Sequence, residues 1–182
     1  MGSDRPAKFA GARVATAEQM ERIGAALGET LRGSGDPGSA LASCGRAVVI
    51  DLQGPLGAGK TTFARGVLRA FGVGGAVKSP SYTLVEPYAT AHGRVAHFDF
   101  YRLASPEEVE YLGMREYLDQ GVCLFEWPER AHGALPPADL RLEIALAGTS
   151  RELMATAPGA VGEGLLEALI LRELLQESVP NT

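Results

Sequence analysis

Residues 54–61 of this 182-residue chain read Gly-Pro-Leu-Gly-Ala-Gly-Lys-Thr, which matches the pattern G-x-x-x-x-G-K-[ST] at every fixed position. Glycines in this pattern let backbone N–H groups approach phosphate oxygens closely, and the helix that follows adds the positive end of its dipole. In such a loop Lys60 reaches the β- and γ-phosphates, and the Thr61 hydroxyl ligates Mg²⁺. The other expected phosphate contacts are Gly54, Leu56, Gly57, Ala58, Gly59 and Thr62. The segment predicts a nucleotide phosphate site with Mg²⁺ as cofactor.

The remaining sequence favours ATP over GTP as the nucleotide. A GTPase would carry an Asp-x-x-Gly after the loop and an Asn-Lys-x-Asp that reads guanine. Here the Asp-x-x-Gly near the loop runs from Asp51 to Gly54 and precedes it, and the only asparagine in the chain is Asn181.

Two carboxylates are placed to serve a metal-dependent reaction. Asp99 closes the apolar run 95–98 and Glu126 closes the run 122–125, so both are expected at strand ends beside the loop. Mg²⁺ in phosphoryl-transfer sites is held by such carboxylates together with substrate phosphates. One of the two would hold the metal or its waters while the other orients the attacking water, and the sequence does not assign which does which. The competing interpretation of Asp99 is an ion pair with Arg102.

Three further features lie near these residues. The segment 79–83, Ser-Pro-Ser-Tyr-Thr, offers Ser81 and Thr83 as hydroxyl groups of a switch-like loop, or it is a plain proline turn. The single Trp127, next to Glu126, is more often a packing anchor than a functional aromatic. His97 alternates into a strand, which favours a structural role.

The surrounding pattern predicts one α/β domain with a mixed parallel and antiparallel sheet flanked by helices. Strands and helices alternate first, and antiparallel pairs follow. We expect a poorly ordered lead-in over 1–12, a P-loop domain over 13–157 and a C-terminal helical tail over 158–182. The expected elements are a helix at 16–31 capped by Thr16, a strand at 47–52, a helix at 60–71, a hairpin of 82–88 with 94–100, a helix from 106, a strand at 121–125 and a hairpin of 140–146 with 151–155.

Composition excludes several classes of protein. Apolar residues make up 46% and charged residues 21%, which is typical of a folded globular chain. The net charge of −5 argues against strong direct nucleic-acid binding by the chain alone. No apolar run reaches the roughly 20 residues of a membrane span, and the N-terminus lacks a secretory pattern, so a cytoplasmic location is expected. Cys44 and Cys123 match no metal or redox spacing.

Taken together, these motifs resemble the TsaE family, small P-loop ATPases of bacterial tRNA threonylcarbamoyladenosine synthesis. The resemblance covers roughly residues 16–156 and is carried by four segments in family order: 56–62, 78–88, 97–103 and 126–129. The segments Ser-Pro-x-Tyr-Thr and Glu-Trp-Pro are far more specific than the P-loop. Three residues depart from the family pattern, namely Pro55 for the usual Asp, Ser81 for Thr, and Met20 in place of a Thr near the nucleotide base.

The resemblance implies roles for individual residues and for partners. It implies that Lys60 and Thr61 serve the phosphates and Mg²⁺, and that Asp99 and Glu126 serve the metal or water. It also makes Ser81 and Thr83 switch-like, Trp127 functional, and Arg151 a residue near the base. The implied partners are TsaB-like and TsaD-like proteins, whose synthesis cycle ATP hydrolysis would support or reset, without strong tRNA binding by this chain alone.

Two other functional classes remain open at this level. A small-molecule P-loop kinase would need an acceptor pocket and usually an arginine-rich lid, and the arginines here are scattered. A nucleotide-gated binding module would have negligible turnover. ATP turnover without an acceptor, and its rise with partners, would separate these classes from a partner-dependent ATPase.

Overall fold

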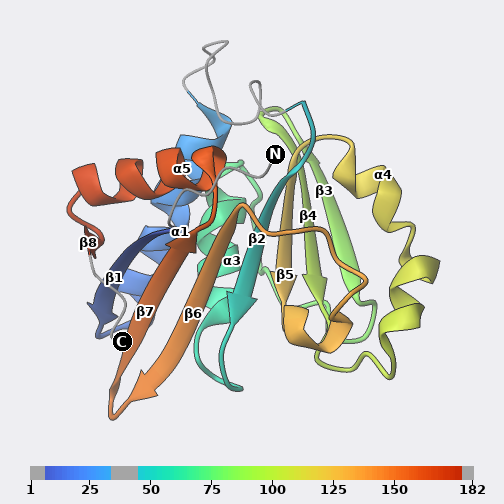
Figure 1. The fold of residues 1–182 in the computed structure, drawn as a ribbon, viewed down its shortest axis with the longest axis horizontal. Helices are drawn as coiled ribbons and strands as arrows, with labels where there is room; N and C mark the ends of the chain where they lie inside the picture. Colours follow the sequence, from blue (N-terminus) through green and yellow to red (C-terminus); the bar gives the residue numbers. More distant parts are fainter. Residues whose placement is uncertain (1–6, 34–44, 178–182) are drawn as a thin grey trace.

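The computed structural model describes residues 7–33 and 45–177, and within these ranges one eight-stranded sheet runs through the molecule (Figure 1). The strand order is β3-β4-β5-β2-β6-β7-β1-β8. The central strands β4, β5, β2 and β6 are parallel to one another, and the pairs β3–β4, β6–β7, β7–β1 and β1–β8 are antiparallel. The prediction of a single α/β domain with a mixed sheet is confirmed.

The elements have the following bounds. The strands are β1 Lys8–Val14, β2 Val48–Gln53, β3 Val85–Thr90, β4 Gly93–Asp99, β5 Val122–Glu126, β6 Leu140–Ala147, β7 Ser150–Ala157 and β8 Gln176–Glu177. The α-helices are α1 Ala17–Arg32, α3 Lys60–Ala70, α4 Met114–Leu118 and α5 Ala160–Leu171. Two short 3₁₀ helices, η1 Pro106–Leu112 and η2 Pro128–Ala131, complete the described part of the chain.

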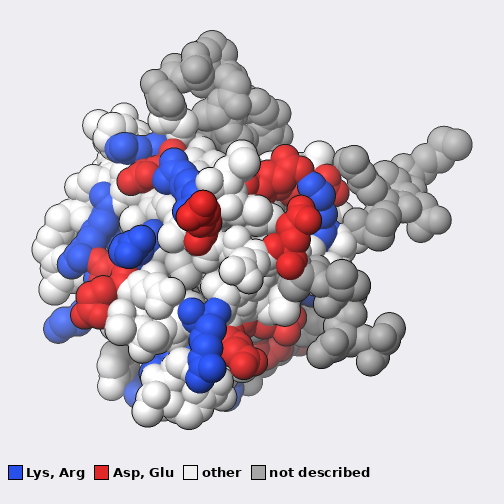
Figure 2. Space-filling model, turned by 90° about the vertical axis from the view of Figure 1, so that its left-hand side faces the viewer, with Lys and Arg blue, Asp and Glu red and all other residues white. Residues whose placement is uncertain are grey.

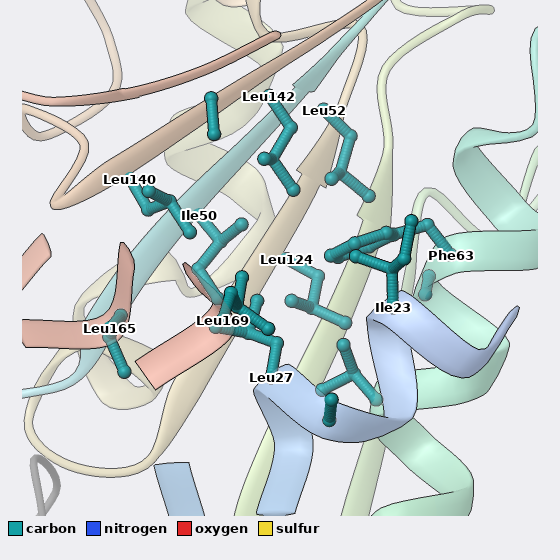
Figure 3. Packing of buried hydrophobic residues seen from close by; sticks show 14 of the residues in the cluster. Ile23, Leu27, Ile50, Leu52, Phe63, Leu124, Leu140, Leu142, Leu165 and Leu169 are labelled. Atoms are coloured by element: carbon teal, nitrogen blue, oxygen red, sulfur yellow. The ribbon is translucent and has the colours of Figure 1, made fainter. Parts of the chain in front are cut away.

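Side-chain alternation along the central strands builds a core on each face of the sheet. Val48, Ile50 and Leu52 of β2 face one way and pack under α1, α3 and α5, whereas Val49 faces the other way toward η1 and α4. Figure 3 shows the first of these cores, in which the labelled side chains are Ile23, Leu27, Ile50, Leu52, Phe63, Leu124, Leu140, Leu142, Leu165 and Leu169. The two cores hold the carboxyl ends of the parallel strands in place.

The N-terminal segment corrects one expectation. Residues Lys8–Val14 form β1, paired with β7 from Lys8↔Ala157 to Val14↔Arg151, so the lead-in expected over 1–12 is wrong for Lys8 onward. Residues 1–6 lie outside the described ranges. The alternation was weak because small residues dominate the strand: Ala10 is buried, and a Cβ on Gly11 would lie 3.0 Å from Leu153 O.

The C-terminal tail is part of the same core. Helix α5 packs on α1, β7 and β1, and Leu165, Leu166 and Leu169 are fully or almost fully buried. The expected helical tail is therefore docked on its own domain, and the helix itself spans Ala160–Leu171. Beyond it, β8 pairs with β1.

The surface on the side of α5 and β1 carries both signs of charge intermixed (Figure 2). Ion pairs link elements on this part of the molecule, including Lys8 with Glu167 and Arg172 with Glu29. No helix in the described part of the chain is long and apolar enough to cross a membrane.

Glycines let α1 and α3 approach at backbone distance. A Cβ on Gly24 would lie 2.2 Å from Phe63 O, and one on Gly66 would lie 2.1 Å from Glu21 O. Such distances leave no room for a side chain, so these glycines set the spacing of the two helices. Since α3 begins at Lys60, the same contact fixes the direction from which the P-loop lysine projects.

We expect Gly66→Ala to destabilise the fold by about 1–3 kcal/mol or more, because the added methyl forces the helices apart. Gly164→Ala is the matched control: Gly164 also lies in a helix, but nothing lies within 4 Å of its Cβ position. This control should be neutral or stabilising by up to about 1 kcal/mol. Urea unfolding of both variants checks the difference, and equal effects would contradict the packing argument.

Candidate functional site

The loop between β2 and α3 adopts the conformation that its glycine spacing predicts. Gly54, Gly57 and Gly59 have φ values of +140°, +77° and +111°, which only glycine adopts without strain. A Cβ on Gly54 would also lie 2.3 Å from Ile144 O. The loop therefore needs all three glycines for its turns, and it needs Gly54 for its close contact with β6.

Lys60 is folded over this loop and is only 4% exposed. Its Nζ donates hydrogen bonds to Gly54 O at 2.6 Å and Pro55 O at 2.9 Å, and lies 3.8 Å from the centre of the Trp127 ring. Burial lowers the pKa of Lys60, and the nearby carboxylates, Glu126 first among them, act in the opposite direction. A positive charge that is shielded from solvent in this way interacts strongly with any anion that enters the loop.

The two predicted carboxylates lie side by side. Asp99 and Glu126 end the parallel strands β4 and β5, are in register with each other, and are 3% and 2% exposed. Alternation places both on the face covered by α3. The Thr61 hydroxyl donates to Glu126 Oε2 at 3.1 Å. The structure thus brings Thr61 and both carboxylates to one edge of the sheet.

Asp99 holds the predicted switch-like segment. Its Oδ2 accepts hydrogen bonds from the hydroxyls of Ser79 and Ser81, the latter at 2.7 Å, and its Oδ1 accepts from Tyr101 N at 2.9 Å. Thr83 is not part of this contact and lines a neighbouring hollow with Lys78. The ion pair of Asp99 with Arg102 is not formed; Arg102 instead stacks on Tyr82 at 4.5 Å.

A cavity of about 220 Å³ lies between the loop, the carboxylates and the segment from Ser79. The predicted site residues that line it are Leu56, Gly57, Gly59, Lys60, Thr61, Thr62, Ser81, Asp99, Glu126 and Trp127. Gly54, Ala58, Thr83 and Arg151 do not line it, although Arg151 Nη2 donates to Gly57 O at 3.3 Å on the loop's outer side. Met20, expected near the base position, is buried beside Gly59.

Sequence reasoning missed three residues of this site. Ser79 and Tyr101 line the cavity, and His97 contacts Glu126 directly, with Nε2 2.8 Å from Oε1. The signal for His97 was available, because a residue two positions before Asp99 in a strand shares its face. Its assignment to a structural role did not include this contact.

Trp127 has an unusual backbone conformation beside Lys60. Its φ of +59° is in the left-handed region, a rare conformation for a bulky residue. The ring stacks against Tyr101 with centres 5.1 Å apart, and Arg130 lies 5.3 Å from the Tyr101 ring. Strain of this kind costs of the order of 1–3 kcal/mol and is concentrated at functional sites.

The donor set suits Mg²⁺ bound together with a nucleotide. Within residues 7–33 and 45–177 no group of three or more His, Cys, Asp or Glu side chains is arranged to hold a metal. Mg²⁺ usually takes one or two carboxylates and completes its shell with waters and phosphates. Thr61 and Glu126 offer such a partial set at the loop.

Below the loop, on the opposite face of β2, Asp51 is buried without full compensation. It is 7% exposed, its Oδ1 has no hydrogen-bond partner among the described residues, and Arg141 Nε lies 3.8 Å from Oδ2. Burial raises the pKa of Asp51 from 3.8 to about 6; Arg141 opposes the rise and Glu129 adds to it.

We therefore expect Asp51→Asn to change how stability depends on pH. Between about pH 4 and pH 6 the native carboxyl keeps a proton that the unfolded chain has released, so stability falls as pH rises, by up to about 3 kcal/mol. Asp51→Asn should remove this fall and be the more stable protein at pH 7. Urea unfolding across pH 4–8 checks this, and a wild-type-minus-variant difference that is constant with pH would contradict it.

Comparison with known proteins identifies close relatives of this sequence and fold. A family model described as "Threonylcarbamoyl adenosine biosynthesis protein TsaE" matches residues 14–153. The tRNA threonylcarbamoyladenosine biosynthesis protein TsaE of Haemophilus influenzae is 44% identical over 124 residues, which cover 68% of this chain and 78% of that protein. The TsaE protein of Bacillus subtilis is 41% identical over 123 residues, covering 66% and 77%. The crystal structure of YdiB from Bacillus subtilis matches 93% of this chain and 99% of its own, with a TM-score of 0.71 and 30% identity.

Proposed function

The chain belongs to the TsaE family and so has a role in tRNA threonylcarbamoyladenosine modification, and from this premise we propose that it binds and hydrolyses ATP with Mg²⁺. The observation that carries the proposal is the convergence of Lys60, Thr61, Asp99 and Glu126 on one cavity under the P-loop. Each of these side chains is a type that phosphoryl transfer uses, and they come together from three separate segments of the chain, the P-loop, β4 and β5.

We assign the binding steps to this chain's own residues. The loop N–H groups and Lys60 hold the phosphates, and Thr61 and Glu126 supply protein ligands to the metal side of the site. Bound Mg²⁺ would neutralise charge on the β- and γ-phosphates. Lys60 would exchange its hydrogen bonds to Gly54 O and Pro55 O for bonds to phosphate oxygens.

The hydrogen bonds support a division of labour between the carboxylates. Glu126 contacts Thr61 directly and ends β5, the strand next to the P-loop strand β2. Asp99 ends the strand beyond it and holds Ser79 and Ser81. We assign Glu126 to the metal side, and Asp99 to the attacking water and to the position of the switch-like segment.

We further propose that turnover depends on TsaB-like and TsaD-like partners in the cytoplasm. The family resemblance supports these partners, and exposed apolar side chains beside the cavity leave surface for a protein contact. Leu56, in the P-loop, is 70% exposed, and Tyr82, in the switch-like segment, is 84% exposed. Aromatic residues such as Tyr82 are enriched at protein–protein interfaces.

Thermal unfolding with nucleotides tests the binding step. Mg·ATP should raise the melting temperature, because a ligand that binds only the native state adds about 2.7 kcal/mol of stability at a hundredfold excess over its dissociation constant. GTP should produce a markedly smaller shift at the same concentration. Equal shifts with the two nucleotides would overturn the choice of base, and no shift with either would overturn the site.

A further inference from the structure

We propose that His97 is a positioning residue that orients Glu126 toward Thr61 and the metal side of the site, an inference that rests on the proposed function. His97 lies on β4 two residues before Asp99 and is fully buried. Its Nε2 lies 2.8 Å from Glu126 Oε1, while Thr61 contacts the other oxygen, Oε2, at 3.1 Å.

The hydrogen-bond chemistry determines the direction of this contact. An ionised carboxylate can only accept, so His97 donates through Nε2–H and the ring is in the Nε2-protonated tautomer. Each Glu126 oxygen then has one donor, and rotation of the carboxylate about its last torsion, which is otherwise broad, is restricted. Oε2 is thereby aimed at Thr61.

The burial of His97 lowers the stability of the fold relative to an apolar side chain at the same position. Its Nδ1 is buried and has no hydrogen-bond partner among the described residues. The neighbouring positions on this face of the sheet, Val95, Val122 and Leu124, are apolar and are 0–1% exposed. An apolar side chain at position 97 would avoid an unpaired polar atom in the core. The hydrogen bond to Glu126 accounts for the presence of a histidine at this core position.

A residue that orients a metal ligand affects metal binding indirectly, through the position of that ligand. Its removal typically lowers metal affinity or activity by about 10–100-fold. We therefore expect His97→Leu to lower the affinity for Mg²⁺ in the ATP complex by about this factor and to lower kcat. Its affinity for ATP without Mg²⁺ should stay within about twofold of the wild-type value. His97→Gln offers an N–H donor at a similar reach and should recover most of the loss.

Val95→Ala is the matched control. Val95 lies on the same strand and the same face, is 1% exposed, and is not in contact with Glu126 in any hydrogen bond. The substitution Val95→Ala removes core volume, so it should lower the melting temperature. The affinity for Mg²⁺ in the ATP complex should stay unchanged. If Val95→Ala and His97→Leu reduce Mg²⁺-dependent binding equally at equal loss of stability, His97 is only a packing residue and the proposal fails.

The binding measurement uses the fluorescence of Trp127, the single tryptophan, during titration of ATP at fixed Mg²⁺ concentrations. It needs no turnover, so the proposed function and this inference can fail separately. A wild-type protein that binds Mg·ATP but releases no phosphate would defeat hydrolysis and leave the His97 result intact. Unchanged Mg²⁺ dependence in His97→Leu, or no recovery in His97→Gln, would overturn the role of His97.

An NMR measurement on the wild-type protein covers the case in which His97→Leu does not fold. The ¹⁵N spectrum of the histidine rings should contain one slowly exchanging Nε2–H, because His97 is buried while His92 and His132 are exposed. This signal should move in Glu126→Gln. A buried ring in the Nδ1-protonated tautomer would overturn the proposal.

Discussion

Lys60→Ala is expected to abolish productive ATP binding and to lower Mg²⁺-dependent turnover by at least about 100-fold, with the fold intact. The lysine is buried, but its charge is directed at the P-loop carbonyls and not into the hydrophobic core. Removal of a preorganised, buried cation removes one of the largest electrostatic contributions to phosphoryl transfer. Phosphate release measures the loss, and circular dichroism measures the fold.

Lys78→Ala is the control for this variant. Lys78 is one of only three lysines in the chain, and it lines the neighbouring hollow and not the cavity under the P-loop. It should retain most of the turnover. Comparable losses in Lys60→Ala and Lys78→Ala would mean that the phosphate site is not the one described, and an unfolded Lys60→Ala protein would count against a purely functional lysine.

Glu126→Gln and Asp99→Asn are expected to lower kcat by about 100-fold or more, in the range that removal of a general base or a charge-stabilising group produces. The two should differ in their dependence on Mg²⁺. Glu126→Gln should raise the Mg²⁺ concentration required, whereas Asp99→Asn should chiefly lower kcat, because Asp99 contacts Ser79 and Ser81 and not Thr61.

The same two substitutions should differ in stability. Two close carboxylates repel each other without a cation, which alone would make either neutral variant more stable. Asp99, however, accepts three hydrogen bonds and Glu126 accepts two, so Asp99→Asn loses more acceptor capacity and should be the less stable of the two variants. Glu143→Gln, an exposed change on β6, is the control for charge alone. If Asp99→Asn or Glu126→Gln hydrolyses ATP at the wild-type rate, the substituted residue has a structural role only.

The parts of the site that depend on local spacing could be predicted from the sequence. The P-loop is such a part, since its glycines and lysine act within eight consecutive residues. The strand-end positions of Asp99 and Glu126 were predictable as well, because short apolar runs precede both. Their direct pairing required in addition that β4 and β5 be adjacent and in register.

The parts that depend on distant pairing could not be predicted in the same way. Strand β1 lacks a strong pattern of its own and exists because it pairs with β7, more than 130 residues later in the chain. The contact of His97 with Glu126 likewise exists only once two strands align. Trp127 could not be placed over Lys60 from its sequence, because its left-handed backbone conformation has no sequence signal in a bulky residue.

Phosphate release by the purified chain with Mg·ATP, measured alone and with TsaB-like and TsaD-like proteins added, tests the proposed function most directly. We predict slow release by the chain alone, a clear rise with the partners, and loss of both in Lys60→Ala. Release that is absent under both conditions, or that persists unchanged in Lys60→Ala, would contradict a Mg²⁺-dependent ATPase at this site.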